Sequence, residues 1–139
     1  MLVEDNADDE VLTLRALKKN NIGSRVFVVR DGVEALDFLF CTNSFSDRDT
    51  HDMPELTLLD IKLPKMNGLE VLRRIRANEH TRGLPIVLFS SSKEQQDLIE
   101  GYQSGANSYV RKSVDFTQFE ESIRQIGSYW LELNEAPPN

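Results

Sequence analysis

Residues 56–68 read LTLLDIKLPKMNG, and they are the part of the chain most informative about its fold class. It begins with a short apolar run and places an acid, Asp60, at the end of that run. Pro64 and Gly68 bound a turn-rich loop, and Asn67 with an acid three residues later is typical of a helix start. A short run without polar alternation suits a strand buried on both faces, as in a parallel sheet covered by helices. The stretch therefore predicts a strand, a loop and a helix in succession.

The same unit recurs on both sides of this stretch. Other short apolar runs lie at residues 2–3, 26–29, 86–89 and 109–110. Pairs typical of helix starts follow these runs at Asn6 and Asp9, at Ser92 and Gln95, and at Asp115 and Gln118. Asp31-Gly32 opens the second helix, and Gly105 suits a left-handed terminator of the fourth. The order strand then helix, five times over, predicts a parallel sheet with helices on both faces and right-handed crossovers.

Two further segments complete the organisation of the chain. Residues 42–54, between the second helix and the third strand, are mostly polar and predict an exposed, partly mobile loop. The last helix carries an apolar stripe whose members step by four and three, namely Phe119, Ile123, Ile126, Trp130 and Leu133.

Composition limits the classes of protein that the chain can belong to. Its 139 residues carry 16 Lys plus Arg against 23 Asp plus Glu, a formal net charge of −7. We expect one acidic domain over residues 1–134, a short tail over 135–139 and no effector domain. The acidic balance argues against nucleic acid as a partner, because phosphate backbones are held mainly by Lys and Arg. Apolar runs no longer than four residues and a single cysteine predict no membrane span, no internal disulfide and a cytoplasmic location.

Five polar side chains fall at the predicted carboxyl ends of the strands: Glu4, Asp5, Asp60, Ser90 and Lys112. Ligands of open α/β sheets collect at this edge, so we expect these side chains to converge. Carboxylates forced together raise one another's pKa unless a cation joins them, and Mg²⁺ prefers oxygen ligands. The sequence therefore predicts a Mg²⁺ site formed by the three acids, with a backbone carbonyl near Lys62 as a further ligand.

Such a site can accept a phosphoryl group. Asp60 is the natural nucleophile, since a carboxylate forms an acyl phosphate without a general base. Mg²⁺ and Lys112 would neutralise phosphoryl oxygens, and Ser90 would donate a hydrogen bond to a third. The neighbouring acids Asp8, Asp9 and Glu10 are interpreted as first-turn acids that favour the dipole of the first helix.

Four strings carry a resemblance to a known family: LVEDN (2–6), LLDIKLPKMNG (58–68), IVLFSSS (86–92) and SGANSYVRK (104–112). In this order and spacing they resemble the receiver domain of two-component response regulators. The resemblance implies a flavodoxin-like (CheY-like), doubly wound α/β fold with five parallel strands in the order 2-1-3-4-5 and five helices. It also implies a signalling protein rather than an enzyme, in which Asp60 receives phosphate from the phosphohistidine of a histidine kinase.

The same resemblance implies a role for each site residue. Glu4 and Asp5 form the acidic pair, with Asp5 the direct Mg²⁺ ligand, and Lys112 binds phosphate. Ser90 is the switch hydroxyl and Tyr109 the switch aromatic. Phosphorylation would pull Ser90 inward while Tyr109 rotates, which changes the face made by the fourth helix, fifth strand and fifth helix.

A second resemblance rests on the long loop before the third strand and on the ending IGSYWLELNE (126–135). These features resemble the small stand-alone receivers that partner cyanobacterial-type phytochrome kinases. The resemblance implies a phytochrome-type kinase partner and a homodimer, with Phe119, Trp130 and Leu133 as interface or core residues.

Two other functions are compatible with the same fold. A receiver fold can serve as a binding module that works without phosphorylation, but the intact set of five strand-end residues speaks against it. A phosphatase with an aspartate nucleophile needs a second acid two residues after the nucleophile, and Lys62 stands there.

Overall fold

The computed structural model describes residues 1–21 and 25–138. Within these residues the sheet has five parallel strands in the order β2-β1-β3-β4-β5, which confirms the predicted order. The strands are β1 (Leu2–Val3), β2 (Val28–Val29), β3 (Thr57–Leu59), β4 (Ile86–Ser90) and β5 (Ser108–Arg111). Only the second half of the predicted run 26–29 pairs as a strand.

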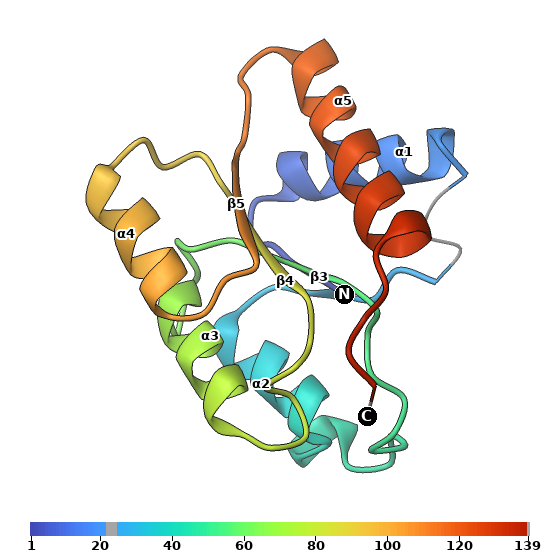
Figure 1. Cartoon of the computed structure of the whole chain (residues 1–139), viewed down its shortest axis with the longest axis vertical. Coiled ribbons are helices and arrows are strands. Elements are labelled where there is room, and N and C mark those ends of the chain that lie inside the picture. The colour runs from blue at the N-terminus through green and yellow to red at the C-terminus, as the bar shows by residue number, and fades with distance from the viewer. Residues whose placement is uncertain (22–24, 139) are drawn as a thin grey trace.

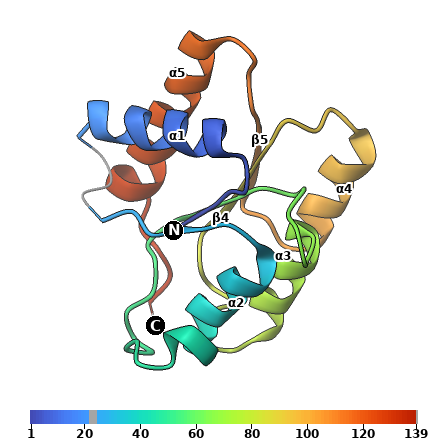
Figure 2. The ribbon, with the colours of Figure 1, turned by 180° about the vertical axis from the view of Figure 1, so that it is seen from behind.

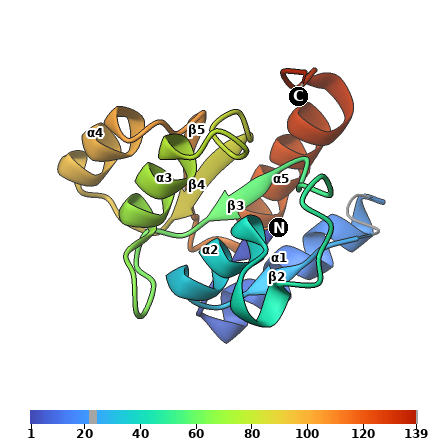
Figure 3. The same cartoon turned by 90° about the horizontal axis from the view of Figure 1, so that it is seen from below.

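The helices cover both faces of the sheet. They are α1 (Ala7–Lys19), α2 (Gly32–Phe40), α3 (Gly68–Ala77), α4 (Gln95–Gln103) and α5 (Phe116–Gly127). Figure 3 shows α1 and α5 on one face of the sheet and α2, α3 and α4 on the other. This is the doubly wound α/β arrangement that the sequence predicts. Among the described residues, no helix combines the length and apolarity that a bilayer crossing requires.

The sheet divides the core into two parts. Consecutive residues of β3 point to opposite faces, so Leu58 packs with the α5 residues while Leu59 packs with those of α2 and α3. On the α5 side, the rings of Phe89 and Phe119 meet edge to face at 5.2 Å. Because both faces are buried, the strands need no polar alternation.

Three of the predicted helix starts are confirmed in detail. The side chains of Asn6, Asp31 and Asp115 each accept a hydrogen bond from the backbone N–H three residues on. Asn67 also caps its helix, although its side chain accepts from the N–H of Leu69. These caps satisfy N–H groups that a helix leaves free at its start.

The predicted start of α4 at Ser92 is wrong. The helix begins at Gln95 after Glu94, and Ser92 stands outside it. The Ser92 hydroxyl donates to Asp97 Oδ2 at 2.6 Å and accepts from the N–H of Glu94 at 3.2 Å. The Ser92 hydroxyl therefore binds the buried carboxylate of Asp97, in the first turn of α4, instead of capping the helix.

Gly105 follows α4 with a φ of +106°, as expected for a left-handed terminator. Arg76 of α3 holds this point by donating to the carbonyl of Gly105 at 2.8 Å. It also donates to the carbonyl of Leu84 at 2.7 Å and to Asn107 Oδ1 at 2.8 Å. One guanidinium therefore joins α3 to the loops on both sides of β4.

The polar segment 42–54 is anchored to the core. It contains a short 3-10 helix, η1 (Asn43–Phe45), and the Phe45 ring meets the Phe38 ring at 5.3 Å. The guanidinium of Arg48 lies 3.6 Å above the Phe38 ring centroid and donates to the Phe38 carbonyl. The segment is exposed as predicted, but its aromatic and cationic anchors were not expected.

Only part of the apolar stripe predicted for the last helix is buried. Phe119, Ile123 and Ile126 are buried, Trp130 is half-buried, and Leu133 is 72% exposed. After α5 the chain continues as a π-helical segment, η2 (Ser128–Leu133), whose wider turn breaks the spacing of three and four. A core position for Leu133 is therefore wrong. Beyond η2 the chain runs from the foot of α5 toward the 42–54 segment, and the C mark lies below the N mark, which sits near the middle of the molecule (Figures 1 and 2).

Candidate metal and phosphoryl site

Four strand ends bring the predicted site residues together. Glu4 and Asp5 follow β1, Asp60 follows β3, Ser90 ends β4 and Lys112 follows β5. Since the strands are parallel, all of these ends lie at one edge of the sheet. The predicted convergence is therefore observed.

The three acids form a compact group of oxygen donors. One carboxylate oxygen from each of Glu4, Asp5 and Asp60 lies within 4.8 Å of the other two. Glu4 is 1% exposed and Asp60 8% exposed, whereas Asp5 faces solvent. Hard oxygen donors with one side open to water suit Mg²⁺, which keeps several waters when it binds to proteins. The donor set therefore fits the metal that the sequence predicts.

Lys112 lies at the centre of the site with a side chain that is only 5% exposed. Its Nζ donates to Glu4 Oε1 at 2.6 Å, to Asp9 Oδ2 at 2.9 Å and to Asp60 Oδ2 at 3.0 Å. An ammonium group has three N–H donors, so all three are used. Burial alone would lower the pKa of Lys112, but Asp60, Glu4 and Asp9 outweigh it and hold this pKa above the usual value.

Glu4 is the most buried acid of the site. Burial raises the pKa of Glu4 to about 7, although the hydrogen bond from Lys112 opposes the shift. The nearby charge of Asp60 adds to the increase. The second oxygen of Glu4 accepts the N–H of Asn6 at 3.2 Å, which ties the carboxylate to the start of α1.

The loop after β3 folds tightly around Asp60. Asp60 Oδ1 accepts the N–H of Ile61 at 2.7 Å, which directs Oδ2 toward Lys112. The N–H of Gly68 donates to the carbonyl of Ile61 at 2.8 Å. A Cβ atom at position 68 would overlap the carbonyl oxygen of Asp60, so only glycine allows this approach. Lys62 is exposed at the rim of this loop, and its carbonyl as a metal ligand stays a prediction.

The two predicted switch residues meet at Ser92. Ser90 is 1% exposed, and its Oγ accepts the N–H of Ser92 at 3.2 Å. The half-buried Tyr109 donates its hydroxyl to the carbonyl of Ser92 at 3.5 Å. Ser92 in turn donates to Asp97, as described above. A chain of hydrogen bonds therefore links the site to the first turn of α4.

Sequence reasoning missed Asp9 as a site residue. Its carboxylate contacts Lys112 at 2.9 Å, although the sequence assigned it only to the dipole of α1. The signal that could have identified it is the cap at Asn6, because a cap fixes which way the first turn faces. That turn begins directly after the acidic pair, so one of its acids faces the strand ends.

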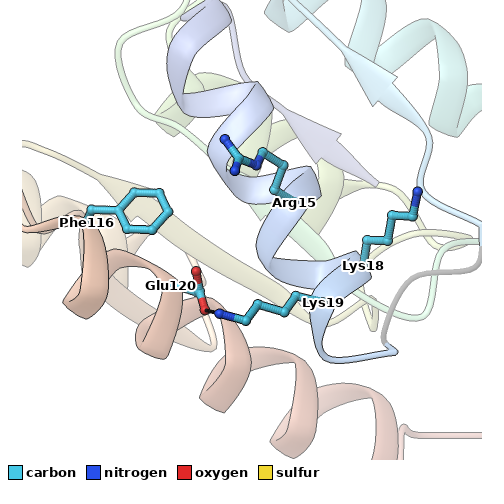
Figure 4. A pocket seen from close by; sticks show the side chains of 5 residues that line it. All are labelled: Arg15, Lys18, Lys19, Phe116 and Glu120. Atoms are coloured by element: carbon cyan, nitrogen blue, oxygen red, sulfur yellow. Dashed lines mark ion pairs between the residues drawn. The ribbon is translucent and has the colours of Figure 1, made fainter.

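Two hollows on the surface include none of the three clustered acids. One, of about 550 Å³, lies between α1 and α5 and is crossed by the ion pair of Lys19 and Glu120 at 2.7 Å (Figure 4). The other, of about 840 Å³, is lined by residues of the 42–54 segment and of η2, such as Phe45, Met53 and Leu131. The clustered acids thus lie at the strand ends, outside both of these hollows.

Similarity to known proteins extends over almost the whole chain. The family model of the response regulator receiver domain matches residues 1–124. Response regulator Rcp1 of Synechocystis is 33% identical over 137 residues, which cover 99% of this chain and 91% of Rcp1.

Solved structures give the same result. The phosphorylated cyanobacterial phytochrome response regulator RcpA superimposes with a TM-score of 0.91 at 33% identity, covering 99% of this chain and 96% of RcpA. The bacteriophytochrome response regulator AtBRR is 47% identical with a TM-score of 0.75, covering 96% of this chain and 95% of AtBRR.

Proposed function

The chain belongs to the family of response regulator receiver domains, and on this premise we propose that Asp60 is its phosphoacceptor. As a member of that family it is a two-component signalling protein. One observation carries the assignment of Asp60: its Oδ2 lies 3.0 Å from the buried ammonium of Lys112, among three acids whose oxygens lie within 4.8 Å of one another.

Transfer from a phosphohistidine needs few protein groups. A carboxylate oxygen of Asp60 forms a bond to phosphorus while the bond from phosphorus to the histidine nitrogen breaks, and the nitrogen keeps the electron pair. Lys112 neutralises a phosphoryl oxygen, and Ser90 donates its hydroxyl to another once it turns from Ser92. The tight loop after Asp60, held by the N–H of Ile61 on Asp60 Oδ1 and by the N–H of Gly68 on the carbonyl of Ile61, keeps the nucleophile fixed.

We assign the metal to the acids that the sequence predicted. Glu4, Asp5 and Asp60 would hold Mg²⁺, with the backbone carbonyl of Lys62 as a further ligand. When bound, Mg²⁺ neutralises charge on the phosphoryl oxygens. Glu4 binds the metal only as a carboxylate, and Asp5 is the acid most open to a hydrated ion.

The proposed switch acts through α4, β5 and α5. Ser90 moves toward the phosphoryl group, Ser92 loses the acceptor of its N–H, and Tyr109 turns into the space that Ser90 leaves. This is a two-state equilibrium biased at one end by new contacts. α4 presents three exposed apolar side chains, Leu98, Ile99 and Tyr102, for a partner to contact.

We propose a phytochrome-type histidine kinase as the partner, with transfer taking place in the cytoplasm. The likeness to RcpA and AtBRR, whose names carry that pathway, supports this choice. We also propose a homodimer, to which exposed Tyr129 and Leu133 of η2 are available, whereas Phe119 is committed to the core. Sedimentation as a monomer, both with and without phosphorylation, would refute the dimer.

The proposed receiver unit extends over residues 1–134. The family model ends at residue 124, but α5 and η2 continue to Leu133 and pack on the core through Trp130 and Leu131. The remaining tail, 135–139, is exposed through Pro138, and Asn139 lies outside the described residues.

The deciding experiment measures phosphate uptake from acetyl phosphate with Mg²⁺ by intact-protein mass spectrometry. Asp60→Asn should abolish the uptake, and removal of Mg²⁺ by EDTA should do the same. The exposed Asp47→Asn is the matched control and should take up phosphate normally. Absence of uptake by the unmodified protein would favour a binding module that works without phosphorylation. A panel of purified histidine kinases then identifies the partner by the rate of transfer to Asp60.

A further inference from the structure

Asp9 is a third carboxylate on Lys112 that the proposed transfer does not use. Its Oδ2 accepts from Nζ at 2.9 Å, next to the bonds to Glu4 and Asp60. The backbone of Asp9 is held separately, because its N–H donates to Asn6 Oδ1 at 3.0 Å. The side chain can therefore move without disturbing the start of α1.

An incoming phosphoryl oxygen can reach Lys112 only by replacing one of these three acceptors, since the ammonium has no free N–H. The three carboxylates differ in how well water can solvate them after they separate from Lys112. The side chain of Glu4 is 1% exposed and that of Asp60 10%, whereas that of Asp9 is 27% exposed. A carboxylate that regains water is released at the lowest cost, so Asp9 is the acceptor that gives way.

The charge balance of the site also identifies Asp9 as the carboxylate that gives way. Glu4, Asp5 and Asp60 are balanced by Lys112 and a divalent cation, and Asp9 adds one negative charge to this balanced set. An extra anion at hydrogen-bond distance from the phosphate-binding ammonium opposes an incoming phosphoryl group. It also favours a bound cation.

We propose that Asp9 is a positioning residue: a displaceable counter-ion of Lys112 that lowers the affinity of the site for a phosphoryl group. The proposal rests on the proposed function, because it assumes that the phosphoryl group is bound at Asp60 beside Lys112. A residue of α1 would then directly influence the affinity of the site for a phosphoryl group.

The proposal predicts opposite effects on anion and cation binding. Asp9→Asn keeps the size and an acceptor oxygen but removes the charge. It should bind beryllofluoride, a phosphoryl mimic, about three- to tenfold more tightly at saturating Mg²⁺, and should take up phosphate from acetyl phosphate faster by a similar factor. Its affinity for Mg²⁺ alone should fall about two- to threefold. A variant that merely damages the site would bind both ions more weakly.

Asp8→Asn is the matched control. Asp8 is exposed in the same turn of α1, so this variant loses the same charge without touching Lys112. Both affinities are measured by titration calorimetry, and the Asp8 variant should match the unmodified protein within a factor of about two, as expected for a screened surface charge. Asp9→Glu keeps the charge and should also stay close to the unmodified protein.

Unchanged or weaker beryllofluoride binding by Asp9→Asn would overturn the proposal, as would an equal gain in Asp8→Asn. If Asp9→Asn does not fold, Asp9→Ser takes its place, with the same two outcomes deciding. If the unmodified protein neither binds beryllofluoride nor takes up phosphate, the proposed function fails instead. Phosphate uptake at Asp60 that is indifferent to Asp9 leaves the proposed function intact and removes only this inference.

Discussion

Glu4 and Lys112, which lie 108 residues apart in the sequence, meet at 2.6 Å between Oε1 and Nζ. Among the described residues this ion pair has the lowest side-chain exposure, 1% and 5%. It reaches from the end of β1 to the end of β5 across the two strands between them. The charge network of the site therefore also holds the carboxyl edge of the sheet together.

Replacing Lys112 should unbalance this network. Lys112→Met leaves Glu4, Asp9 and Asp60 without their shared cation, and we expect the free energy of unfolding to fall by about 3–5 kcal/mol without metal. Mg²⁺ should restore more stability to this variant than to the unmodified protein, because it supplies the missing charge. Urea denaturation in EDTA and in MgCl₂ measures both effects.

Arg111→Met is the control for this prediction, because Arg111 is the exposed residue directly before Lys112, at the end of β5. It should change stability by less than about 0.5 kcal/mol. Equal losses in the two variants, or a loss that Mg²⁺ does not reduce, would show that Lys112 is not the cation that balances these acids.

The high pKa of Glu4 should make both stability and metal binding depend on pH. Because the pKa rises from 4.5 to about 7 on folding, the contribution of this carboxyl to stability is complete below pH 4.5 and is lost as the pH rises through 7. Mg²⁺ requires the deprotonated form, so its affinity should rise with pH up to about 7 and then level off.

Calorimetric titrations on both sides of neutral pH check the second effect, and proton release on metal binding should accompany it. Glu4→Gln should bind Mg²⁺ more weakly and without this pH dependence. A pH profile that survives in Glu4→Gln would assign the titration to another group.

Ser92 should control the first turn of α4. Ser92→Ala removes the hydrogen bond to Asp97, a carboxylate that is only 9% exposed, and should destabilise the protein by about 1–3 kcal/mol. Backbone amides near Gln95 should exchange with solvent faster, as measured by hydrogen–deuterium exchange. Ser91→Ala changes an exposed hydroxyl beside it and should have neither effect. Protection of α4 that is the same in both variants would contradict a role for Ser92.

Gly68 should be indispensable to the geometry of Asp60. In Gly68→Ala the new methyl group overlaps the Asp60 carbonyl, so the loop must shift, with a loss of roughly 1–3 kcal/mol or more and slower phosphate uptake. Gly83→Ala is the matched control, because its Cβ would meet only Pro137 at 3.7 Å. Denaturation and mass spectrometry together test the prediction. Normal uptake by Gly68→Ala would mean that the loop tolerates displacement.

Local patterns predicted the features of this molecule that are local. The apolar runs identified the five strands, and the caps at Asn6, Asp31 and Asp115 set three helix starts to the residue. Because parallel strands end at one edge, the convergence of Glu4, Asp60 and Lys112 also followed from the order of the elements.

The misses all depend on contacts made in three dimensions. Ser92 has the sequence context of a cap, but Asp97 takes its hydroxyl. Leu133 fits a helical stripe, but the π-helical turn carries it into solvent. In the sequence Asp9 is an ordinary acid of a first helical turn, and its contact with Lys112 arises only because β5 ends beside α1. Neither spacing nor residue type contains that information.

The two ends of α4 are fastened very differently. Its last turn leads into Gly105, and Arg76 donates hydrogen bonds to Gly105 and to Asn107 there. Its first turn is held mainly by the hydrogen bond from Ser92 to Asp97. A helix fixed at one end and lightly held at the other moves as a hinged arm, with the largest displacement at the free end. A protein that reads the phosphorylated state should therefore contact α4 near Gln95, where the travel is greatest, rather than near Gln103.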